Sequence, residues 1–395
     1  MNNRTREFIE KNIDSDVRQL ALQGCRDKAV DFSLALRQIA GRQIARRKLP
    51  SWAALDEILY PPHLNLEQCS SEQTARYKAD ICRRLLSTIH DSPTTLFDLT
   101  GGFGVDFSFM SQAFQASTYV ECDNELFSIS SKNLAILAPQ AQYINGDGLE
   151  ILHQMTRDTM IFLDPARRDN HGGRTYGIAD CVPNVLEIRD ELLQKADYVM
   201  LKLSPMLDWR KAVSDLGESH VSEIHIVSVQ NECKELLIIM QQNNENELTI
   251  HCVNDDAVFS YHPSASNNSH NSHLPSFTHL YEPNASLMKA GCFTEIEQAF
   301  GIQQLAQNSH LFVADKLLAD FPGRSFQVLA VSSMNRQDLK AALQDMQQAN
   351  ITVRNFPMSV AELRKRLKLR EGGSIYLFAT TLPDGKRVLI ICQHA

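Results

Sequence analysis

Short apolar strands alternate with helices between about residues 95 and 240, and this alternation limits the fold more than any other feature of the sequence. Each helix returns the chain to the start of the next strand, so strands arranged in this way form a parallel, doubly wound sheet. The expected strands are 96–99, 117–121, 142–144, 159–163 and 198–203, and the expected helices are 107–114, 126–137 and 149–155. Strands at 223–229 and 235–240 are joined by a short polar link, which predicts an antiparallel pair at the edge of the sheet.

The flanking segments have other patterns. Residues 1–90 carry apolar residues at helical spacing, which predicts an N-terminal helical region whose last helix starts after Ser70-Ser71. Residues 325–395 read strand, helix, strand, helix and hairpin, which predicts a separate small domain. The residues before it, 246–324, include a polar low-complexity stretch at 264–276 that we expect to be a mobile loop. The sequence therefore predicts an α/β protein with a sheet domain at 91–245 and smaller domains after it.

Composition excludes several classes of protein. The chain has 395 residues, 43% of them hydrophobic and 22% charged, which suits two or three globular domains of about 150 residues each. No apolar run reaches the roughly 18 residues of a membrane span, and the N-terminus has no apolar signal-peptide core, so we expect a cytoplasmic protein. The nine cysteines form no Cys-x-x-Cys pair, and no carboxylate or cysteine accompanies the histidines near 264–276, so we expect no metal. These histidines are His262, His270 and His273.

The strongest chemical motif is a glycine-rich turn after the first strand, running from Asp98 to Gly104 with the sequence DLTGGFG. Glycines let the backbone approach a ligand closely where a side chain would block it. Many nucleotide-binding folds use such a loop, so the loop alone indicates a ligand site without naming the ligand.

Acidic residues follow the next three strands of the same sheet. Glu121 and Asp123 end the second strand, Asp147 follows the third, and Asp164 follows the fourth. An acid about twenty residues after the glycine turn can accept hydrogen bonds from both ribose hydroxyls of a nucleoside. Each acid alone is equally typical of a helix cap, but all of them in order, each after a strand, predict a nucleoside-binding edge.

This set resembles the class I S-adenosylmethionine-dependent methyltransferases, which have a Rossmann-like sheet. The resemblance implies S-adenosylmethionine as cofactor, with the ribose at Glu121, Asp123 nearby, and adenine at Asp147. It implies further that Asp164 lies where the substrate meets the methyl group, and that the glycine turn holds the methionine end through Asp98, Thr100, Gly101, Gly102 and Gly104. The sequence departs from the family at Thr100, where glycine is usual. A dinucleotide-dependent dehydrogenase would favour that glycine and lacks the Asp164-Pro165 element.

The whole chain is similar to a bacterial methyltransferase family with a C-terminal THUMP-like domain. The motifs that carry this similarity are TARYKA (74–79), DLTGGFGVD (98–106), DPARR (164–168), LKLSPMLD (201–208), Lys234-Glu235 and YEPNASLMKAG (281–291). The resemblance implies a ferredoxin-like insert within 246–324 and a THUMP-like domain at 325–395. THUMP domains proper bind RNA in tRNA-modifying enzymes, so the resemblance implies an RNA substrate, tRNA or rRNA, by analogy.

Two kinds of methyl acceptor remain open. Amine methyltransferases carry Asp or Asn, two prolines and an aromatic after the fourth strand, and here only Asp164-Pro165 of that motif is present. Ribose 2′-O-methyltransferases carry a Lys-Asp-Lys-Glu set, and this chain offers Lys78, Asp164, Lys202 and Glu235 in that order. A lysine among carboxylates can orient a ribose hydroxyl and help to deprotonate it.

Basic residues supply the candidate substrate contacts. Arg167 and Arg168 follow Pro165 and would grip a phosphate at the mouth of the site, or pair with local acids. The C-terminal residues Arg364, Lys365 and Lys368 share a helix face by their spacing, and a net charge of −8 requires such local basic patches in a nucleic-acid binder. Alternatives to an RNA methyltransferase are a methyltransferase acting on a protein or small molecule, and a non-catalytic RNA-binding protein.

Overall fold

The structure is a computed structural model that describes all residues except 88, 90–92, 168–176, 245–246, 264–276 and 345. The stretch expected to be a mobile loop, 264–276, therefore lies outside the described residues, as do Arg168, His270 and His273. The chain divides into two compact units. The first comprises Met1–Ser222 with Leu236–Asn246, and the second comprises Glu223–Glu235 with Glu247–Ala395.

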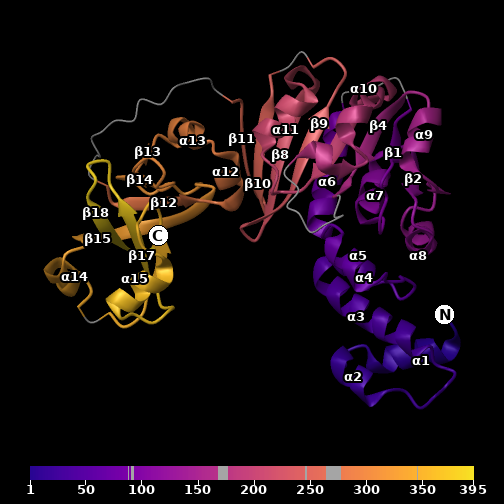
Figure 1. The fold of residues 1–395 in the computed structure, drawn as a ribbon, viewed down its shortest axis with the longest axis horizontal. Coiled ribbons are helices and arrows are strands. Elements are labelled where there is room, and N and C mark those ends of the chain that lie inside the picture. Colours follow the sequence, from indigo (N-terminus) through magenta and orange to yellow (C-terminus); the bar gives the residue numbers. More distant parts are fainter. Residues whose placement is uncertain (88, 90–92, 168–176, 245–246, 264–276, 345) are drawn as a thin grey trace. The chain divides into compact units, whose positions relative to one another are not determined.

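The first unit begins with helices, as the apolar spacing predicted (Figure 1). They are α1 (Asn3–Asn12), α2 (Val17–Gln23), α3 (Phe32–Lys48), α4 (Pro50–Ala53), α5 (His63–Gln68) and α6 (Glu72–Leu86). The hydroxyl of Ser71 accepts the backbone amide of Thr74 at 3.2 Å, so Ser71 caps α6. The buried side chains of Leu49, Trp52 and Tyr60 belong to one apolar core with Phe103 of the glycine turn. The helical region is therefore packed onto the sheet domain.

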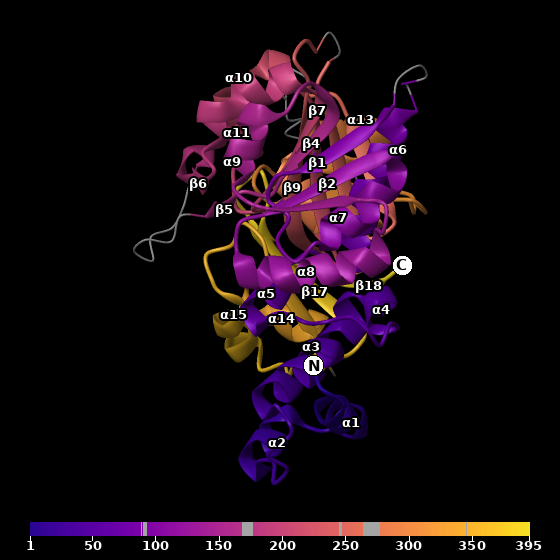
Figure 2. The ribbon, with the colours of Figure 1, turned by 90° about the vertical axis from the view of Figure 1, so that its right-hand side faces the viewer.

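The rest of the first unit alternates between strands and helices. Its elements are β1 (Thr95–Asp98), α7 (Val105–Met110), η1 (Ser111–Ala113), β2 (Ala116–Glu121), α8 (Asn124–Leu137), β3 (Gln142–Asn145), α9 (Gly148–Gln154), β4 (Asp158–Leu163), β5 (Ala166–Arg167), η2 (Ile178–Asp180), β6 (Cys181–Val182), α10 (Val185–Lys195), β7 (Ala196–Leu203), α11 (Trp209–Leu216) and η3 (Glu218–His220). Figure 2 shows α9, α10 and α11 on one face of β1, β4 and β7, with α6 and α7 on the other face. Helices on both faces explain why the centres of β4 and β7, residues 160–163 and 199–201, are continuous buried apolar runs.

The sheet has nine strands in the order β11-β10-β8-β9-β7-β4-β1-β2-β3. β1 pairs in parallel with both β2 and β4, and the chain builds outward in opposite directions from this point. Ligands of open α/β sheets bind at the carboxyl ends of the strands beside such a switch in strand order. Asp98 is the last residue of β1, so it lies at this switch point.

The antiparallel strands do not lie at the edge of the sheet, and that expectation is wrong. β8 (Val221–Val229) and β9 (Glu232–Met240) are interior strands, with β9 antiparallel to β7. The sheet continues with β10 (Thr249–Asn254), which runs parallel to β8, and β11 (Ala257–Tyr261). Buried apolar residues in β10, such as Ile250 and Cys252, make this extension favourable. Local periodicity does not show which strand β10 pairs with, so the extension was not predicted.

The second unit contains a seven-stranded sheet in the order β13-β14-β12-β15-β18-β17-β16. Its elements after β11 are β12 (His279–Pro283), α12 (Ala285–Ala290), α13 (Phe293–Phe300), β13 (Gln303–Gln304), β14 (Phe312–Ala314), β15 (Gly323–Ser333), α14 (Arg336–Ala342), β16 (Asn350–Val353), α15 (Val360–Leu367), β17 (Ile375–Thr381) and β18 (Arg387–His394). The elements after residue 324 have the predicted order. β15 pairs with β12 on one side and with β18 on the other, because its eleven residues are long enough to serve both.

Candidate functional site

The glycine turn after β1 is held closely against β2. A Cβ atom on Gly101 would lie 2.1 Å from the ring of Tyr119, so any other residue at this position would displace that buried ring. Gly102 has a φ of +56°, and its backbone amide donates to Glu121 Oε2 at 2.8 Å. Gly104 begins α7 as its N-cap. The turn therefore brings a row of backbone groups to the carboxyl end of β1.

The three acids after β2 and β3 have different surroundings. Glu121 accepts the amides of Gly102 and, at 2.7 Å, of Asp123, so its carboxylate is fixed beside the glycine turn. Asp123 and Asp147 are exposed N-caps of α8 and α9, and the Oδ1 atom of each accepts a backbone amide at 2.7 Å. Helix capping thus explains their local role, and it uses one oxygen of each carboxylate.

Thr100, the residue that departs from the family pattern, joins the glycine turn to the end of β4. Its hydroxyl oxygen accepts the backbone amide of Asp164 at 2.6 Å. The side chain of Asp164 remains 40% exposed, whereas Pro165 beside it is buried. Arg167 lies in the short strand β5, whose partner is β6.

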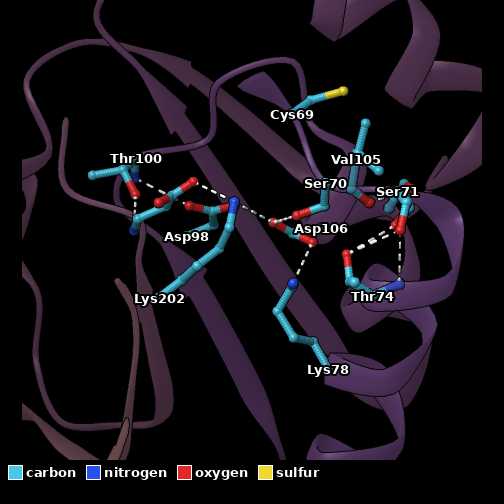
Figure 3. Close-up of polar contacts among 12 residues, drawn as sticks. Cys69, Ser70, Ser71, Thr74, Lys78, Asp98, Thr100, Val105, Asp106 and Lys202 are labelled. Atoms are coloured by element: carbon cyan, nitrogen blue, oxygen red, sulfur yellow. Dashed lines mark hydrogen bonds and ion pairs between the residues drawn. The ribbon is translucent and has the colours of Figure 1, made fainter. Parts of the chain in front are cut away.

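Asp164 and three further charged side chains form a connected group. Figure 3 labels those three, Lys78, Asp106 and Lys202, with their neighbours. Lys202 on β7 places its Nζ atom 2.5 Å from Asp164 Oδ2 and 3.3 Å from Asp106 Oδ2. Lys78 on α6 lies 3.2 Å from Asp106 Oδ1, and the Ser70 hydroxyl donates to Asp106 Oδ2 at 2.7 Å. Lys78 is fully buried and Lys202 nearly so, whereas Asp164 reaches solvent. The arrangement is a buried charge network with one accessible end.

Burial and charge shift the pKa values of two acids in opposite directions. Burial raises the pKa of Asp98 well above its ordinary value, and the nearby carboxylates of Asp106 and Asp164 raise it further. Burial also opposes ionisation of Asp106, but Lys78, Lys202 and Ser70 outweigh it, so the pKa of Asp106 is lowered. Asp98 is therefore an acid that becomes ionised most readily when a cation is placed beside it.

Three of the four residues expected for hydroxyl methylation belong to this network. The structure brings Asp164 and Lys202 together, while Lys78 reaches Asp106. Glu235 is a buried residue of β9. Asp106 was not among the predicted site residues, although it is the last residue of the DLTGGFGVD motif and the only acid in α7. An acid in an otherwise buried helical turn was the signal for a buried cationic partner.

The basic residues of the second unit do not share one helix face as expected. α15 ends at Leu367, and Lys368 follows it as a C-cap with a φ of +59°. The Arg364 guanidinium donates to the carbonyl of Ala349 at 3.0 Å and is half-buried, so it has a structural partner. Lys365 and Lys368 are exposed.

The residues around the glycine turn fit an S-adenosylmethionine cofactor. A buried carboxylate suits the ammonium group of the methionine end, the glycine turn permits close approach, and Glu121 offers carboxylate oxygens for ribose hydroxyls.

Within the described parts of the chain, no helix is long and apolar enough to cross a membrane.

Comparisons with known proteins identify the family of this chain. Residues 323–394 match the family model for a THUMP domain-like family, and residues 279–322 match a ferredoxin-like domain. A protein of Porphyromonas gingivalis W83, named as a methyltransferase, has a crystal structure that matches with a TM-score of 0.83 and 30% identity, covering 99% of this chain and 97% of that chain. Two Mycobacterium tuberculosis proteins, from strains CDC 1551 and H37Rv, are named as uncharacterized S-adenosylmethionine-dependent methyltransferases. Each is 23% identical over 340 residues, which cover 85% of this chain and 86% of the relative.

The chain is an enzyme that uses S-adenosylmethionine. The match to the Porphyromonas protein covers nearly the whole length of both chains, and the THUMP-like match lies at the C-terminus. The chain therefore belongs to the class I S-adenosylmethionine-dependent methyltransferases that carry a C-terminal THUMP-like domain.

Proposed function

We propose that this enzyme methylates RNA, on a base amine or a ribose 2′-hydroxyl, and that Asp164 and Lys202 lie at its reacting centre. The observation that carries this proposal is the 2.5 Å contact between Lys202 Nζ and Asp164 Oδ2, at the carboxyl ends of β7 and β4. Asp164 is accessible, while the network behind it is buried. A substrate can therefore approach the pair through Asp164.

We assign the cofactor contacts to the edge formed by β1, β2 and β3. Asp98, Thr100, Gly101, Gly102 and Gly104 would hold the methionine end, Glu121 with Asp123 the ribose, and Asp147 the adenine. S-adenosylmethionine supplies an electrophilic methyl group. The hydrogen bond from the Gly102 amide to Glu121 supports this assignment, because it holds the carboxylate beside the turn before any ligand binds.

The Asp164–Lys202 pair can serve either kind of acceptor. A ribose hydroxyl loses its proton as it attacks the methyl group, and Asp164 can accept that proton while the Lys202 ammonium stabilises the developing negative oxygen. A base amine needs hydrogen-bond acceptors for its N–H groups, which Asp164 provides and Lys202 does not. Lys78 and Asp106 would then act as positioning residues, because they fix Lys202 from behind.

The RNA assignment rests on the THUMP-like match and on local positive charge. Lys365 and Lys368 are exposed and lie in the segment 364–370, five of whose seven residues are basic, so this segment is locally positive although the net charge of the chain is −8. Arg167, with Arg168 after it, follows the reacting Asp164-Pro165 and is suited to a phosphate. These features favour RNA over a small molecule, which needs no extended basic surface.

The decisive experiment is mass spectrometry of RNA nucleosides from a deletion strain and its parent. One methylated nucleoside should disappear on deletion, return with the wild-type gene, and remain absent with Asp164→Asn. Asp215→Asn is a matched control, because Asp215 also pairs with a lysine, Lys211 at 2.9 Å, but on the surface of α11. Identical nucleoside profiles in deletion and parent strains would contradict an RNA substrate and redirect the search to proteins and small molecules.

A further inference from the structure

Two histidines and a glutamate meet on neighbouring strands of the second unit, and none of them has a role in the proposed methyl transfer. Glu223 and His225 alternate along β8, so their side chains project from the same face of the strand. His251 on β10 is paired in parallel register with His225. The register therefore places two imidazoles side by side with a carboxylate next to them.

The ligand atoms of the three side chains converge. Glu223 Oε2 lies 2.9 Å from His225 Nε2 and 3.8 Å from His251 Nε2, and one ligand atom from each residue lies within 4.8 Å of the others. An ion with tetrahedral bonds of about 2.0–2.2 Å holds its ligand atoms about 3.3–3.5 Å apart. The imidazoles are stacked, with ring centroids 4.4 Å apart and an interplanar angle of 14°, so binding requires the rings to turn about their side-chain torsions.

The surroundings of the cluster orient these atoms. The Ser260 hydroxyl lies 2.7 Å from His251 Nδ1, which leaves Nε2 of that ring directed toward Glu223. Histidines that bind metals are oriented in this way, through a hydrogen bond at the other ring nitrogen. The side chains of His225, Glu223 and His251 are 2%, 14% and 19% exposed, so the cluster is largely shielded but can be reached.

We propose that Glu223, His225 and His251 bind one divalent transition-metal ion of the zinc type, with a fourth coordination position left to water. Imidazole nitrogens suit zinc, copper, nickel and iron, whereas calcium and magnesium take oxygen ligands. Two histidines and a carboxylate with an open position form a ligand set that zinc uses in enzymes. The ion would join β8 to β10, two strands that are separated in the sequence by β9.

This site escapes a reading of the sequence because its ligands form no local motif. Glu223 and His225 resemble alternate residues of an ordinary strand, and His251 becomes their neighbour only through the β8–β10 pairing. Without a metal, the same cluster can share a proton between its imidazoles and its carboxylate. The experiment below separates these two possibilities.

The test is calorimetric titration of Zn²⁺ into the full-length protein, with any purification tag removed and metal stripped by a chelator. We expect one equivalent to bind, with protons released, because metal ligands must be deprotonated. The affinity should therefore rise as the pH is raised from about 5.5 to about 7.5. Co²⁺ should bind at the same site with the visible absorption of a nitrogen- and oxygen-ligated ion, and Cu²⁺ should bind more tightly than Zn²⁺.

His251 and Glu223 are partly exposed, so variants at these two positions test the site without opening a cavity in the core. His251→Gln and Glu223→Gln should each weaken Zn²⁺ binding by at least about 100-fold, and Ser260→Ala by about 10–100-fold, the usual cost of losing an orienting hydrogen bond. His279→Ala, which removes an imidazole from β12, is the matched control and should bind like the wild type. Circular dichroism of each variant establishes that it is folded.

Two results would overturn the proposal. One is the absence of stoichiometric Zn²⁺ binding by folded wild-type protein at pH 7.5, which would leave the cluster as a proton-sharing group. The other is binding of one equivalent that is unaffected in both His251→Gln and Glu223→Gln, which would place the ion elsewhere.

Discussion

The hydroxyl of Thr100 accepts a hydrogen bond of 2.6 Å from the backbone amide of Asp164, and this bond joins the turn after β1 to the end of β4. It links the proposed cofactor loop to the proposed reacting carboxylate. A glycine at position 100, as in the family pattern, would lack this acceptor.

Replacement of Thr100 by Val should impair methyl transfer more than cofactor binding. Valine has nearly the same shape but accepts no hydrogen bond, so Asp164 would lose a constraint worth about 0.5–1.5 kcal/mol. We expect kcat to fall about 2- to 10-fold with little change in the cofactor Kd, and Thr100→Ser to restore most activity. Steady-state kinetics and calorimetry measure the two effects, and an unchanged kcat in Thr100→Val would contradict this positioning role.

Asp164→Asn should reduce methyl transfer by at least about tenfold, which corresponds to about 1.4 kcal/mol of transition-state stabilisation. Cofactor affinity should change much less. If a ribose hydroxyl is methylated, Lys202→Ala should be nearly as damaging, because the lysine manages the charge on the oxygen. If a base amine is methylated, Lys202→Ala should be mild.

The control for these variants is the surface pair Lys211 and Asp215, whose substitution should leave activity unchanged. Lys202→Ala also leaves Asp106 with one lysine fewer, so its stability must be measured alongside its activity. Full activity in both Asp164→Asn and Lys202→Ala would place the reacting centre elsewhere.

Glu121→Ala should weaken S-adenosylmethionine binding by roughly 1–3 kcal/mol, the cost of removing a partner of buried hydrogen-bonding groups. The neighbouring Glu125→Ala is the control, because Glu125 is exposed and pairs with Arg37 on the surface. Calorimetry with purified protein measures both. Equal affinities of the two variants for S-adenosylmethionine would contradict the assignment of Glu121 to the cofactor site.

Cofactor affinity should rise with pH because of Asp98. Its pKa is raised in the free protein, so the carboxyl group must ionise before it can pair with the ammonium group of the methionine end. For each pH unit below that pKa, the free energy of cofactor binding becomes less favourable by about 1.4 kcal/mol, which raises the Kd by a factor of about ten. The Kd should therefore fall as the pH rises, until Asp98 is ionised in the free protein or the cofactor amine loses its proton, near about pH 8.

Calorimetry between about pH 6 and pH 8 tests this relationship, with Asp98→Asn as the variant that cannot titrate. We expect the variant to bind weakly and with little dependence on pH. A wild-type affinity that is constant across this range would show that Asp98 does not change its protonation on binding.

Charge reversal of Lys365 and Lys368 should weaken RNA binding and leave cofactor binding unchanged. Phosphate contacts release counterions, so the plot of log affinity against log salt should lose about one unit of slope for each lysine. Lys340→Glu with Lys386→Glu is a control of equal charge change on exposed residues of the same unit. Equal losses in the two double variants would mean that net charge, and not this patch, governs binding.

Local periodicity was sufficient to predict the helices of residues 1–90, the strands β1 to β4 and the elements after residue 324. Alternating apolar residues and turn residues at strand ends are local properties. They were enough to predict that acids stand at the ends of β1 to β4. The sequence order of these motifs also predicted that Asp98, Glu121 and Asp164 face one edge of the sheet, because parallel strands end together.

Tertiary structure decided what local patterns do not encode. β9 lies between β7 and β8, and β15 pairs with both β12 and β18, because strand partners are selected by buried area and backbone hydrogen bonds between distant segments. The same holds for the site. Lys78, Asp106 and Lys202 come from α6, α7 and β7, and only the packing of these elements brings both ammonium groups within 3.3 Å of the Asp106 carboxylate, where burial makes each charge depend on its partner.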